Sequence, residues 1–445
     1  MNFKESVSYL YGLGHEILAM KLGLETIRLL AESCGNPHLE FNAVHIAGTN
    51  GKGSTAAFTD SILRAAGIRS GLYTSPHLDS ITERIMIGGK GISPDDFARL
   101  ATLVREMGEG LVSDGVLQFP PTFFEQITMI AYLFFAEQGI DLAVLEVGMG
   151  GRLDATNICR PVVTAITPVG MDHQQYLGDT LAKIAAEKGG IIKRGVPIVI
   201  APQKEEALEV ILARARELEA PAILSGNNCR AVPVQSSDIF DRGKYRITCQ
   251  SGGLKIESKL NLRGRHQILN ACTAIRISEE LAGSGWPISP DAVSSGLSSV
   301  EWPGRLEMIT LSDDKAPILL DGAHNIDGAG VLREFLDDHF HDTPVTLLFG
   351  AMADKDVDAM CGVLFPAAIR IITTKVSNPR AESSEKLSTL AANSQAEIFR
   401  TESVTEAISL GLKITPPTGL ICISGSLYLV GEAKRFLDQS KENYN

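Results

Sequence analysis

Short apolar runs alternate with longer amphipathic stretches along most of the chain. In the first 300 residues these runs cover 43–47, 142–147, 162–167 and 196–200. Apolar runs without polar alternation are typical of strands that are buried on both faces of a parallel sheet. The amphipathic stretches between them indicate helical β-α-β crossovers. The pattern therefore predicts an α/β fold with a doubly wound, mostly parallel sheet.

A second series of apolar runs begins after residue 300. These runs cover 318–320, 345–349, 369–373 and 420–423. A stretch rich in Gly and Pro, which includes Trp302-Pro303-Gly304, separates the two series. We therefore predict a P-loop-type domain over residues 1–300 and a smaller Rossmann-like α/β domain over residues 301–445. Residues 226–262 alternate in short segments, which predicts a small β excursion.

A glycine-rich heptapeptide follows the first apolar run and precedes a helical stretch that ends near Ala66. Its residues are Gly48, Thr49, Asn50, Gly51, Lys52, Gly53 and Ser54. Glycines allow backbone N–H groups to converge on phosphate oxygens, and a helix N-terminus and a lysine add positive charge. Gly53 separates Lys52 from Ser54, so the loop departs from the common G-x-x-x-x-G-K-[ST] pattern. We predict a phosphate-binding loop, and the alternative is a purely structural strand-to-helix turn.

The charge balance limits the classes of partner. The 445-residue chain carries a formal net charge of −12, which argues against a chain-wide surface for nucleic acid or anionic membranes but allows a local basic pocket. The longest apolar stretch, 127–136, is shorter than the roughly 20 residues that span a bilayer. The N-terminus lacks the basic start and apolar core of a secretory signal. We predict a cytoplasmic protein without nucleic-acid or membrane partners.

The cysteines show no recognisable pattern. There are seven, at positions 34, 159, 229, 249, 272, 361 and 422, and none forms a C-x-x-C pair. An odd, scattered set is typical of reduced thiols in an intracellular protein. We therefore predict that the fold contains no disulfide.

Five segments occur in an order that identifies a family. They are AGTNGKGS (47–54), TSPHL (74–78), EVGMGGRLDATN (146–157), MDH (171–173) and DGAHN (321–325). Together they resemble folylpolyglutamate synthase and dihydrofolate synthase, members of the Mur ligase superfamily, over residues 18–432. The resemblance implies an ATP-dependent ligase that phosphorylates a folate carboxylate and then joins L-glutamate to it. The segment 120–125 resembles bifunctional bacterial forms, which implies that dihydropteroate is a substrate too.

The resemblance also implies a metal site. Alone, Ser75 is a turn hydroxyl, Glu146 a hydrated strand end and His173 a hydrogen-bonded loop residue. In the resembling family the matching positions line magnesium sites, and Lys188 matches a lysine that becomes a carbamate. Otherwise Lys188 only complements the C-terminus of a helix. The implied cofactors are ATP, Mg²⁺ at two sites and a monovalent cation, and the implied catalytic residues are Lys52, Lys188, His173 and Arg305.

Substrate contacts follow from the same resemblance. The implied folate contacts are Met20, Lys21, Leu22, Thr122, Phe123, Phe124, Glu125, Leu153, Asp154 and Ala155. An aromatic wall suits a flat heterocycle, although the ordinary position of two phenylalanines is the core. Asn270, Arg305 and Asp321 are implied nucleotide contacts, and Asp321 and His324 are implied glutamate contacts at the start of a helix. Arg305 has an alternative as a solvated linker charge.

Three other functions stay open at this point. A folylpolyglutamate synthase without the dihydrofolate synthase activity carries the same motifs. A Mur-type peptidoglycan-precursor ligase has the same chemistry, but we expect a separate N-terminal domain before its phosphate loop. A nucleotide-binding switch is disfavoured by the irregular loop and the second α/β domain. We expect a monomer whose partners are a folate or dihydropteroate and L-glutamate.

Overall fold

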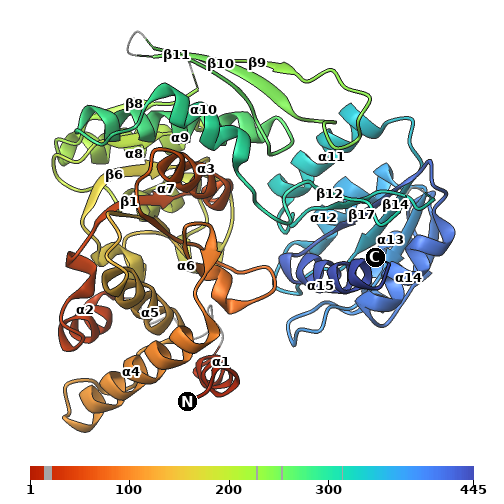
Figure 1. Cartoon of the computed structure of the whole chain (residues 1–445). Coiled ribbons are helices and arrows are strands. Elements are labelled where there is room, and N and C mark those ends of the chain that lie inside the picture. Colours follow the sequence, from red (N-terminus) through yellow and green to blue (C-terminus); the bar gives the residue numbers. More distant parts are fainter. Residues whose placement is uncertain (15–22, 227–228, 252–253, 313, 445) are drawn as a thin grey trace. The chain divides into compact units, whose positions relative to one another are not determined.

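The computed structural model describes residues 1–14, 23–226, 229–251, 254–312 and 314–444. Its contacts divide the chain into two compact units. The first unit contains residues 1–230, 248–258 and 269–300, and the second contains 231–247, 259–268 and 301–445. Figure 1 labels most of the helices and several of the strands of each unit.

An eight-stranded, mostly parallel sheet forms the centre of the first unit, as predicted. Its strand order is β4-β3-β2-β5-β1-β6-β7-β8. The strands are β1 (Asn42–Ala47), β2 (Ser70–Tyr73), β3 (Ile85–Ile87), β4 (Lys90–Gly91), β5 (Leu142–Glu146), β6 (Pro161–Ile166), β7 (Ile198–Ile200) and β8 (Ala222–Leu224). Only the edge pairs β2–β3 and β3–β4 are antiparallel in this sheet. The predicted doubly wound sheet is therefore confirmed, with a short antiparallel edge.

Helices of this part of the chain pack on the sheet or on one another through buried apolar side chains. They are α1 (Phe3–Gly12), α2 (Glu25–Ser33), α3 (Lys52–Ala65), α4 (Pro94–Ser113), α5 (Phe123–Glu137), α6 (Gln174–Leu177), α7 (Leu181–Gly189), α8 (Glu205–Glu217), α9 (His266–Gly283) and α10 (Pro290–Ser299). One core cluster joins α5 to α1, α2 and α4, and another joins α7 and α8 to β6 and β7. Helices α3 and α10 pack closely, since a Cβ on Gly296 would lie 2.5 Å from the Ile62 Cα atom.

The carboxyl ends of the parallel strands meet at one edge of the sheet, where ligands bind in open α/β folds. Strand β1 leads into residues 48–51 before α3 begins at Lys52. Strand β5 ends at Glu146, and residues 167–173 follow β6. The topology thus brings the phosphate loop, Glu146 and the segment with His173 to the same edge.

The excursion predicted over residues 226–262 is a three-stranded sheet. Its order is β11 (Leu254–Lys259), β10 (Tyr245–Ser251) and β9 (Cys229–Pro233). A disulfide joins Cys229 on β9 to Cys249 on β10. The prediction of seven reduced thiols is wrong for this pair, because strand pairing brings together two cysteines that lie 20 residues apart in the sequence. The other five cysteines are free thiols.

A six-stranded sheet forms the centre of the second unit. Its order is β12-β13-β17-β14-β15-β16. The strands are β12 (Glu307–Ile309), β13 (Ile318–Leu320), β14 (Val345–Phe349), β15 (Arg370–Thr373), β16 (Glu397–Arg400) and β17 (Leu420–Ser424), and the helices are α11 (Ile326–Phe340), α12 (Val357–Leu364), α13 (Ser384–Ala391), α14 (Val404–Ile414) and α15 (Leu427–Tyr444). All strand pairs are parallel except β12 with β13. The second, smaller α/β body is also confirmed.

Hydropathy along the helices does not reach the level of a membrane segment. Within the described ranges, no helix combines the length and the apolar character that crossing a bilayer requires.

Candidate active site

Two glycines fix the path of the phosphate loop. Gly48 and Gly51 have φ angles of 150° and 86°, a region that glycine adopts without the steric cost of a side chain. A Cβ on Gly48 would overlap the Thr167 hydroxyl, and one on Gly51 would overlap the side-chain oxygen of Asn270. The loop therefore lies directly against the end of β6 and against α9. Both glycines are required by geometry as well as by conformation.

Two lysines from distant parts of the sequence, Lys52 at the start of α3 and Lys188 on α7, bind carbonyl groups of this loop. Lys52 Nζ donates to the Thr49 carbonyl at 3.0 Å, and Lys188 Nζ donates to the Gly48 carbonyl at 2.6 Å. The Thr49 N–H donates to the Pro168 carbonyl at 3.0 Å. The first N–H groups of a helix have no acceptor within the helix, so the start of α3 adds positive potential beside Lys52.

Lys188 is almost completely buried on α7. Burial, and secondarily the positive charge of Lys52, lower the pKa of Lys188 from 10.5 to about 7, while Asp172 and Asp154 act in the opposite direction. A lysine with this pKa is neutral for a large fraction of the time at physiological pH. Neutral amines are nucleophilic, so the geometry allows the carbamate that the resemblance implies. The sequence carries no local signal for this burial.

Glu146 and Ser75 come together at the sheet edge. Glu146 ends β5 and is 5% exposed, and its Oε2 atom accepts a hydrogen bond from the Ser75 N–H at 3.2 Å. A carboxylate beside a hydroxyl-bearing residue offers the hard oxygen donors that Mg²⁺ prefers. The chemistry of these two donors therefore fits magnesium.

His173 is the N-cap residue of α6 and has a left-handed backbone, at φ 51°. Its N–H donates to Asp172 Oδ1 at 2.9 Å, and its Nε2 atom lies 3.7 Å from Asp172 Oδ2. In the described part of the chain, the only group of three or more His, Cys, Asp or Glu ligand atoms is a cysteine cluster elsewhere. Phosphate oxygens and water would therefore complete the coordination of a magnesium ion here.

The glycine-rich turn after β5 is held by Asp154. The Asp154 carboxylate accepts hydrogen bonds from the Met149 N–H at 2.9 Å and from the N–H and hydroxyl groups of Thr156 at 3.0 and 2.5 Å. Burial raises the pKa of Asp154 despite these bonds. A Cβ on Gly148 would overlap the Phe124 ring, so this turn packs on the aromatic segment. Beside Asp154, Leu153 is half-buried and Ala155 is buried.

The residues of the aromatic segment at the start of α5 have different surroundings. Phe123 is 1% exposed and stacks on Tyr11 with ring centroids 5.6 Å apart, as expected for a core residue. Phe124 lies near the Tyr73 ring, at 6.2 Å. Thr122 and Glu125 form a capping box, in which Glu125 Oε2 accepts from both the N–H and the hydroxyl of Thr122 at 2.8 Å.

Three residues that sequence reasoning missed surround Phe123. Arg84 is buried, with its guanidinium 5.4 Å from the Phe123 ring centre, and its Nε donates to His77 Nδ1 at 2.8 Å. Because Nδ1 accepts, the proton of neutral His77 is on Nε2, which donates to the Tyr11 hydroxyl at 3.2 Å. Burial and Arg84 lower the pKa of His77 to about 3. His77 stands in the TSPHL segment, so a signal for it was present. Met20, Lys21 and Leu22 lie outside the described residues.

In the second unit, Arg305 and Asp321 lie close together. Asp321 Oδ2 accepts from the Leu306 N–H and Oδ1 from the Ala323 N–H, both at 3.0 Å. Burial raises the pKa of Asp321 and Arg305 partly offsets this rise. A Cβ on Gly322 would overlap the Arg305 guanidinium. The neighbouring Arg305 is half-buried rather than fully solvated.

Two histidines complete this group. Burial and the nearby Arg305 lower the pKa of His266 to about 4. His324 Nδ1 lies 2.8 Å from the Gly322 carbonyl, which requires the proton on Nδ1. The expectation that Asp321 and His324 begin a helix is wrong. Both precede α11, whose N-cap is Asn325, because the Asn325 side chain supplies the cap that ends the loop after β13.

Family models match both parts of the chain. The Mur ligase middle domain matches residues 46–278, and the glutamate ligase domain of Mur ligases matches residues 304–427. The chain is 34% identical to the dihydrofolate synthase/folylpolyglutamate synthase of Bacillus subtilis, over 94% of this chain and 95% of that protein. It is also 34% identical to a probable bifunctional folylpolyglutamate synthase/dihydropteroate synthase of Haloferax volcanii. That match covers 98% of this chain but only 50% of the length of the relative.

Solved structures agree with these matches. Mycobacterium tuberculosis folylpolyglutamate synthase complexed with ADP superposes with a TM-score of 0.88 at 30% identity, covering 98% of each chain. E. coli FolC in complex with DHPP and ADP superposes with a TM-score of 0.84 at 26% identity, covering 99% of this chain and 98% of that one. The resemblance inferred from the five motifs is thus confirmed. The chain belongs to the folylpolyglutamate synthase and dihydrofolate synthase family of Mur ligases.

Proposed function

We propose that this protein is an ATP-dependent ligase that joins L-glutamate to folates and to dihydropteroate. The observation that carries the proposal is the phosphate loop, in which Lys52 and the buried Lys188 each donate a hydrogen bond to a loop carbonyl. Strand β5 ends with Glu146 at the same edge of the sheet. The family supports it, and so does the ADP bound to the related M. tuberculosis enzyme. The DHPP complex of E. coli FolC supports a pterin substrate.

The reaction proceeds in two steps. A carboxylate oxygen of the folate attacks the γ-phosphorus of ATP, which forms an acyl phosphate and releases ADP. The amino group of L-glutamate then attacks the acyl carbon, phosphate leaves, and the amine loses a proton to give the amide. Activation is needed because a carboxylate is a poor electrophile. Lys52 and the N-terminus of α3 stabilise charge that develops on the transferring phosphoryl group.

We propose that magnesium binds at this site, because the side chains there offer suitable donor atoms. Ser75, Glu146 and His173 would hold one part of it, and Lys188 would contribute as a carbamate. Bound there with a monovalent cation nearby, two Mg²⁺ ions would neutralise the triphosphate. Other residues of the chain give the phosphate loop its shape. Gly48 and Gly51 determine its backbone path, and Asn270 packs beside it.

Residues 1–300 are proposed to bind ATP and the pterin-bearing substrate, and residues 301–445 to bind glutamate. For the pterin, Phe124 beside Gly148 and the buried Asp154 are the candidates best supported by contacts. For glutamate, Asp321 and His324 are the candidates, and Arg305 is assigned to the nucleotide. Because these groups are divided between the two domains, a chain ending at residue 300 should make no amide.

An ATP-hydrolysis assay that combines either dihydropteroate or tetrahydrofolate with glutamate tests the function. ADP release with both substrates, dependent on glutamate, supports the bifunctional ligase. Release with tetrahydrofolate alone indicates a folylpolyglutamate synthase. Release that needs a uridine-nucleotide precursor instead would indicate a peptidoglycan-precursor ligase. ADP release that needs no acceptor would contradict the ligase and favour a nucleotide switch.

Glu146→Gln and His173→Ala should each raise the magnesium concentration needed for half-maximal turnover. Each change removes a side chain that would hold the magnesium ion opposing the triphosphate charge, and we expect roughly a tenfold to hundredfold loss of turnover at limiting magnesium. The measurement is initial rate against magnesium concentration. Glu109→Gln, at an exposed ion pair on α4, is the matched control. A magnesium requirement equal to that of the parent enzyme in both variants would remove these residues from the metal site.

Arg305→Ala should lower turnover about a hundredfold and leave the protein folded. The guanidinium is half-buried and bonds to the Gly304 carbonyl at 3.2 Å, so its loss removes one charge but little packing. Arg333→Ala, which breaks an ion pair on α11, serves as the control. Full activity of Arg305→Ala would identify Arg305 as a linker residue without a role in catalysis.

A further inference from the structure

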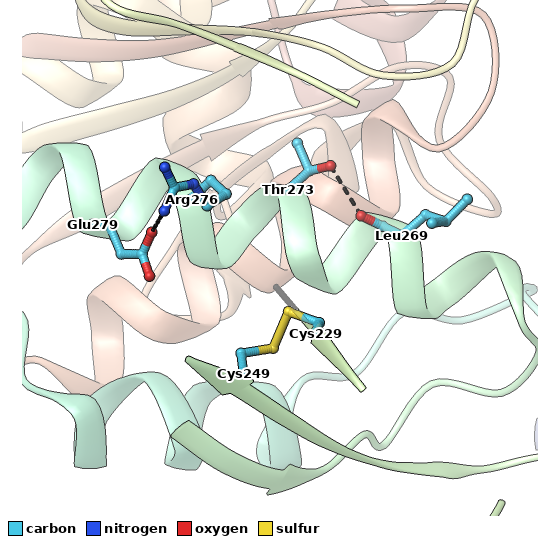
Figure 2. The surroundings of a disulfide bond; sticks show 6 residues. All are labelled: Cys229, Cys249, Leu269, Thr273, Arg276 and Glu279. Atoms are coloured by element: carbon cyan, nitrogen blue, oxygen red, sulfur yellow. Dashed lines mark hydrogen bonds and ion pairs between the residues drawn. A yellow bond between two sulfur atoms is a disulfide. The ribbon is translucent and has the colours of Figure 1, made fainter. Parts of the chain in front are cut away.

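Three of the seven cysteines come together in the first unit, on three different elements. Cys229 lies on β9, Cys249 on β10 and Cys272 on α9, and their sulfur atoms all lie within 4.8 Å of one another. Cys229 and Cys249 form the disulfide, which lies beside the stretch of α9 that carries Leu269 and Thr273 (Figure 2). The proposed ligase reaction uses none of these three residues.

This cluster is enclosed by packed structure. Cys249 and Cys272 are 1% and 2% exposed, whereas Cys229 is half-buried. The neighbouring Thr273 hydroxyl donates to the Leu269 carbonyl at 2.9 Å and lies 3.0 Å from the Ser225 hydroxyl. Helix α9 thus holds the third sulfur, that of the buried Cys272, close to the disulfide. Of these three described cysteines, only Cys229 is exposed enough to meet an incoming reagent or ion.

The spacing of the sulfurs suits a metal once the disulfide is open. A tetrahedral ion with bonds of about 2.3 Å to sulfur places its sulfur ligands about 3.8 Å apart. Breaking the Cys229–Cys249 bond allows these two sulfurs to separate to such a distance, and Cys272 already lies within 4.8 Å of both. Shifts of about 1 Å, which side-chain rotation provides, would produce a three-sulfur site.

The charge of the cluster selects the ion. Thiolates favour soft or borderline cations such as Cu⁺ and Zn²⁺. Three thiolates leave a net charge of −1 around Zn²⁺ but −2 around Cu⁺, and uncompensated charge is costly where two of the three sulfurs are buried. Zn²⁺ also accepts three protein ligands and one water, which can enter beside the half-buried Cys229.

We propose that Cys229, Cys249 and Cys272 form a redox-gated site that binds one Zn²⁺ ion when the disulfide is reduced. A dithiol reductant attacks the accessible Cys229 sulfur, becomes oxidised to its own disulfide, and leaves two cysteine thiols. Zn²⁺ then displaces the protons of the three thiols, which pass to solvent. The disulfide and the zinc-bound form exclude each other, because both need the sulfurs of Cys229 and Cys249. Cys272 lies on α9, and the same helix carries Asn270, whose side chain lies against Gly51 of the phosphate loop.

The test is metal titration of the full chain in its two redox states. Protein reduced by a dithiol and freed of it under anaerobic conditions is titrated with Cd²⁺, whose thiolate charge-transfer absorption reports sulfur ligation, and Zn²⁺ is then added as a competitor. We expect one Cd²⁺ per reduced chain and none on the oxidised chain, and because thiolates prefer the softer Cd²⁺, we expect Zn²⁺ to displace it only at a large molar excess. Absence of thiolate-bound Cd²⁺ on the reduced chain would overturn the proposal, as would equal binding by the oxidised chain.

Variants separate this site from other thiols. Cys272→Ser retains the disulfide partners but should bind Cd²⁺ at least a hundredfold more weakly than the parent chain. Cys229→Ser, which changes the half-buried position, should lose affinity similarly and remove the dependence on redox state. Cys422→Ser, at a buried free thiol on β17, is the matched control and should bind normally. Parent-like affinity in both Cys272→Ser and Cys229→Ser would show that the three cysteines do not form a metal site.

Discussion

Lys52→Ala should lower ligation at least a thousandfold while the protein keeps its fold. The side chain donates to the Thr49 carbonyl at 3.0 Å at the start of α3, so its charge is directed into the loop that we assign to the triphosphate. A thousandfold loss corresponds to about 4 kcal/mol of transition-state stabilisation, which is typical for removal of one preorganised charge or donor. The measurement is glutamate-dependent ADP release, with melting temperature as the check on folding.

The control for this prediction is another lysine of the same unit. Lys183 lies on α7 and pairs with Asp179 at 2.7 Å on the surface, with 62% of its side chain exposed. Lys183→Ala should retain nearly full turnover, since exposed ion pairs contribute little. Near-normal ligation by Lys52→Ala would mean that Lys52 does not contact the transferred phosphate.

The parts of this fold that depend on neighbouring residues in the sequence could be predicted from the sequence. Apolar runs predict the central strands, and the spacing of Gly48, Gly51 and Lys52 predicts the loop. These features are local because strand burial and helix N-termini are determined by contiguous residues. The motif order then identified the family.

The missed features depend on contacts between distant segments. Tyr11, His77 and Arg84 meet around Phe123 only because α1, the segment after β2 and the start of α5 pack together. The disulfide is non-local in the same way, since it requires the pairing of β9 with β10. Neither has a spacing rule that a single sequence reveals.

Thr122 and Glu125 show a different kind of omission. The T-x-x-E spacing is the signature of a capping box, and the structure forms that box at the start of α5. The spacing alone therefore predicts a local structural role for both residues. Their hydrogen bonds to each other support a structural role, and any contact with folate would be additional to it.

Lys188→Arg should lower ligation about as strongly as Lys52→Ala. Arginine keeps the positive charge but does not deprotonate in proteins, so it cannot react with carbon dioxide. Lys188 is suited to this reaction because its pKa is about 7 instead of 10.5. About half of this lysine is neutral near pH 7, against about one in three thousand for an ordinary lysine. Lys188→Met, which removes the charge at similar volume, should be equally inactive.

The pH dependence follows from the sign of this shift. The folded chain binds the Lys188 proton less tightly than the unfolded chain, whose pKa is near 10.5. Above pH 7 the buried amine is increasingly neutral while the unfolded chain still holds the proton, so this group favours folding more as the pH rises toward 10.5. Carbamate occupancy should therefore rise as the pH increases through about 7, in the same direction as the neutral amine.

Carbon-13 bicarbonate gives a readout that a merely structural lysine would not produce. The labelled parent enzyme should show a carbamate carbon signal that grows between about pH 6 and pH 8, following deprotonation of the amine, and that Lys188→Arg and Lys188→Met lack. Because the Lys52 charge lowers the pKa of Lys188, Lys52→Ala should move the rise of this signal to higher pH. A fully active parent enzyme without the signal would show that Lys188 acts as an amine at the Gly48 carbonyl, and that its burial serves to fix the loop rather than to make a metal ligand.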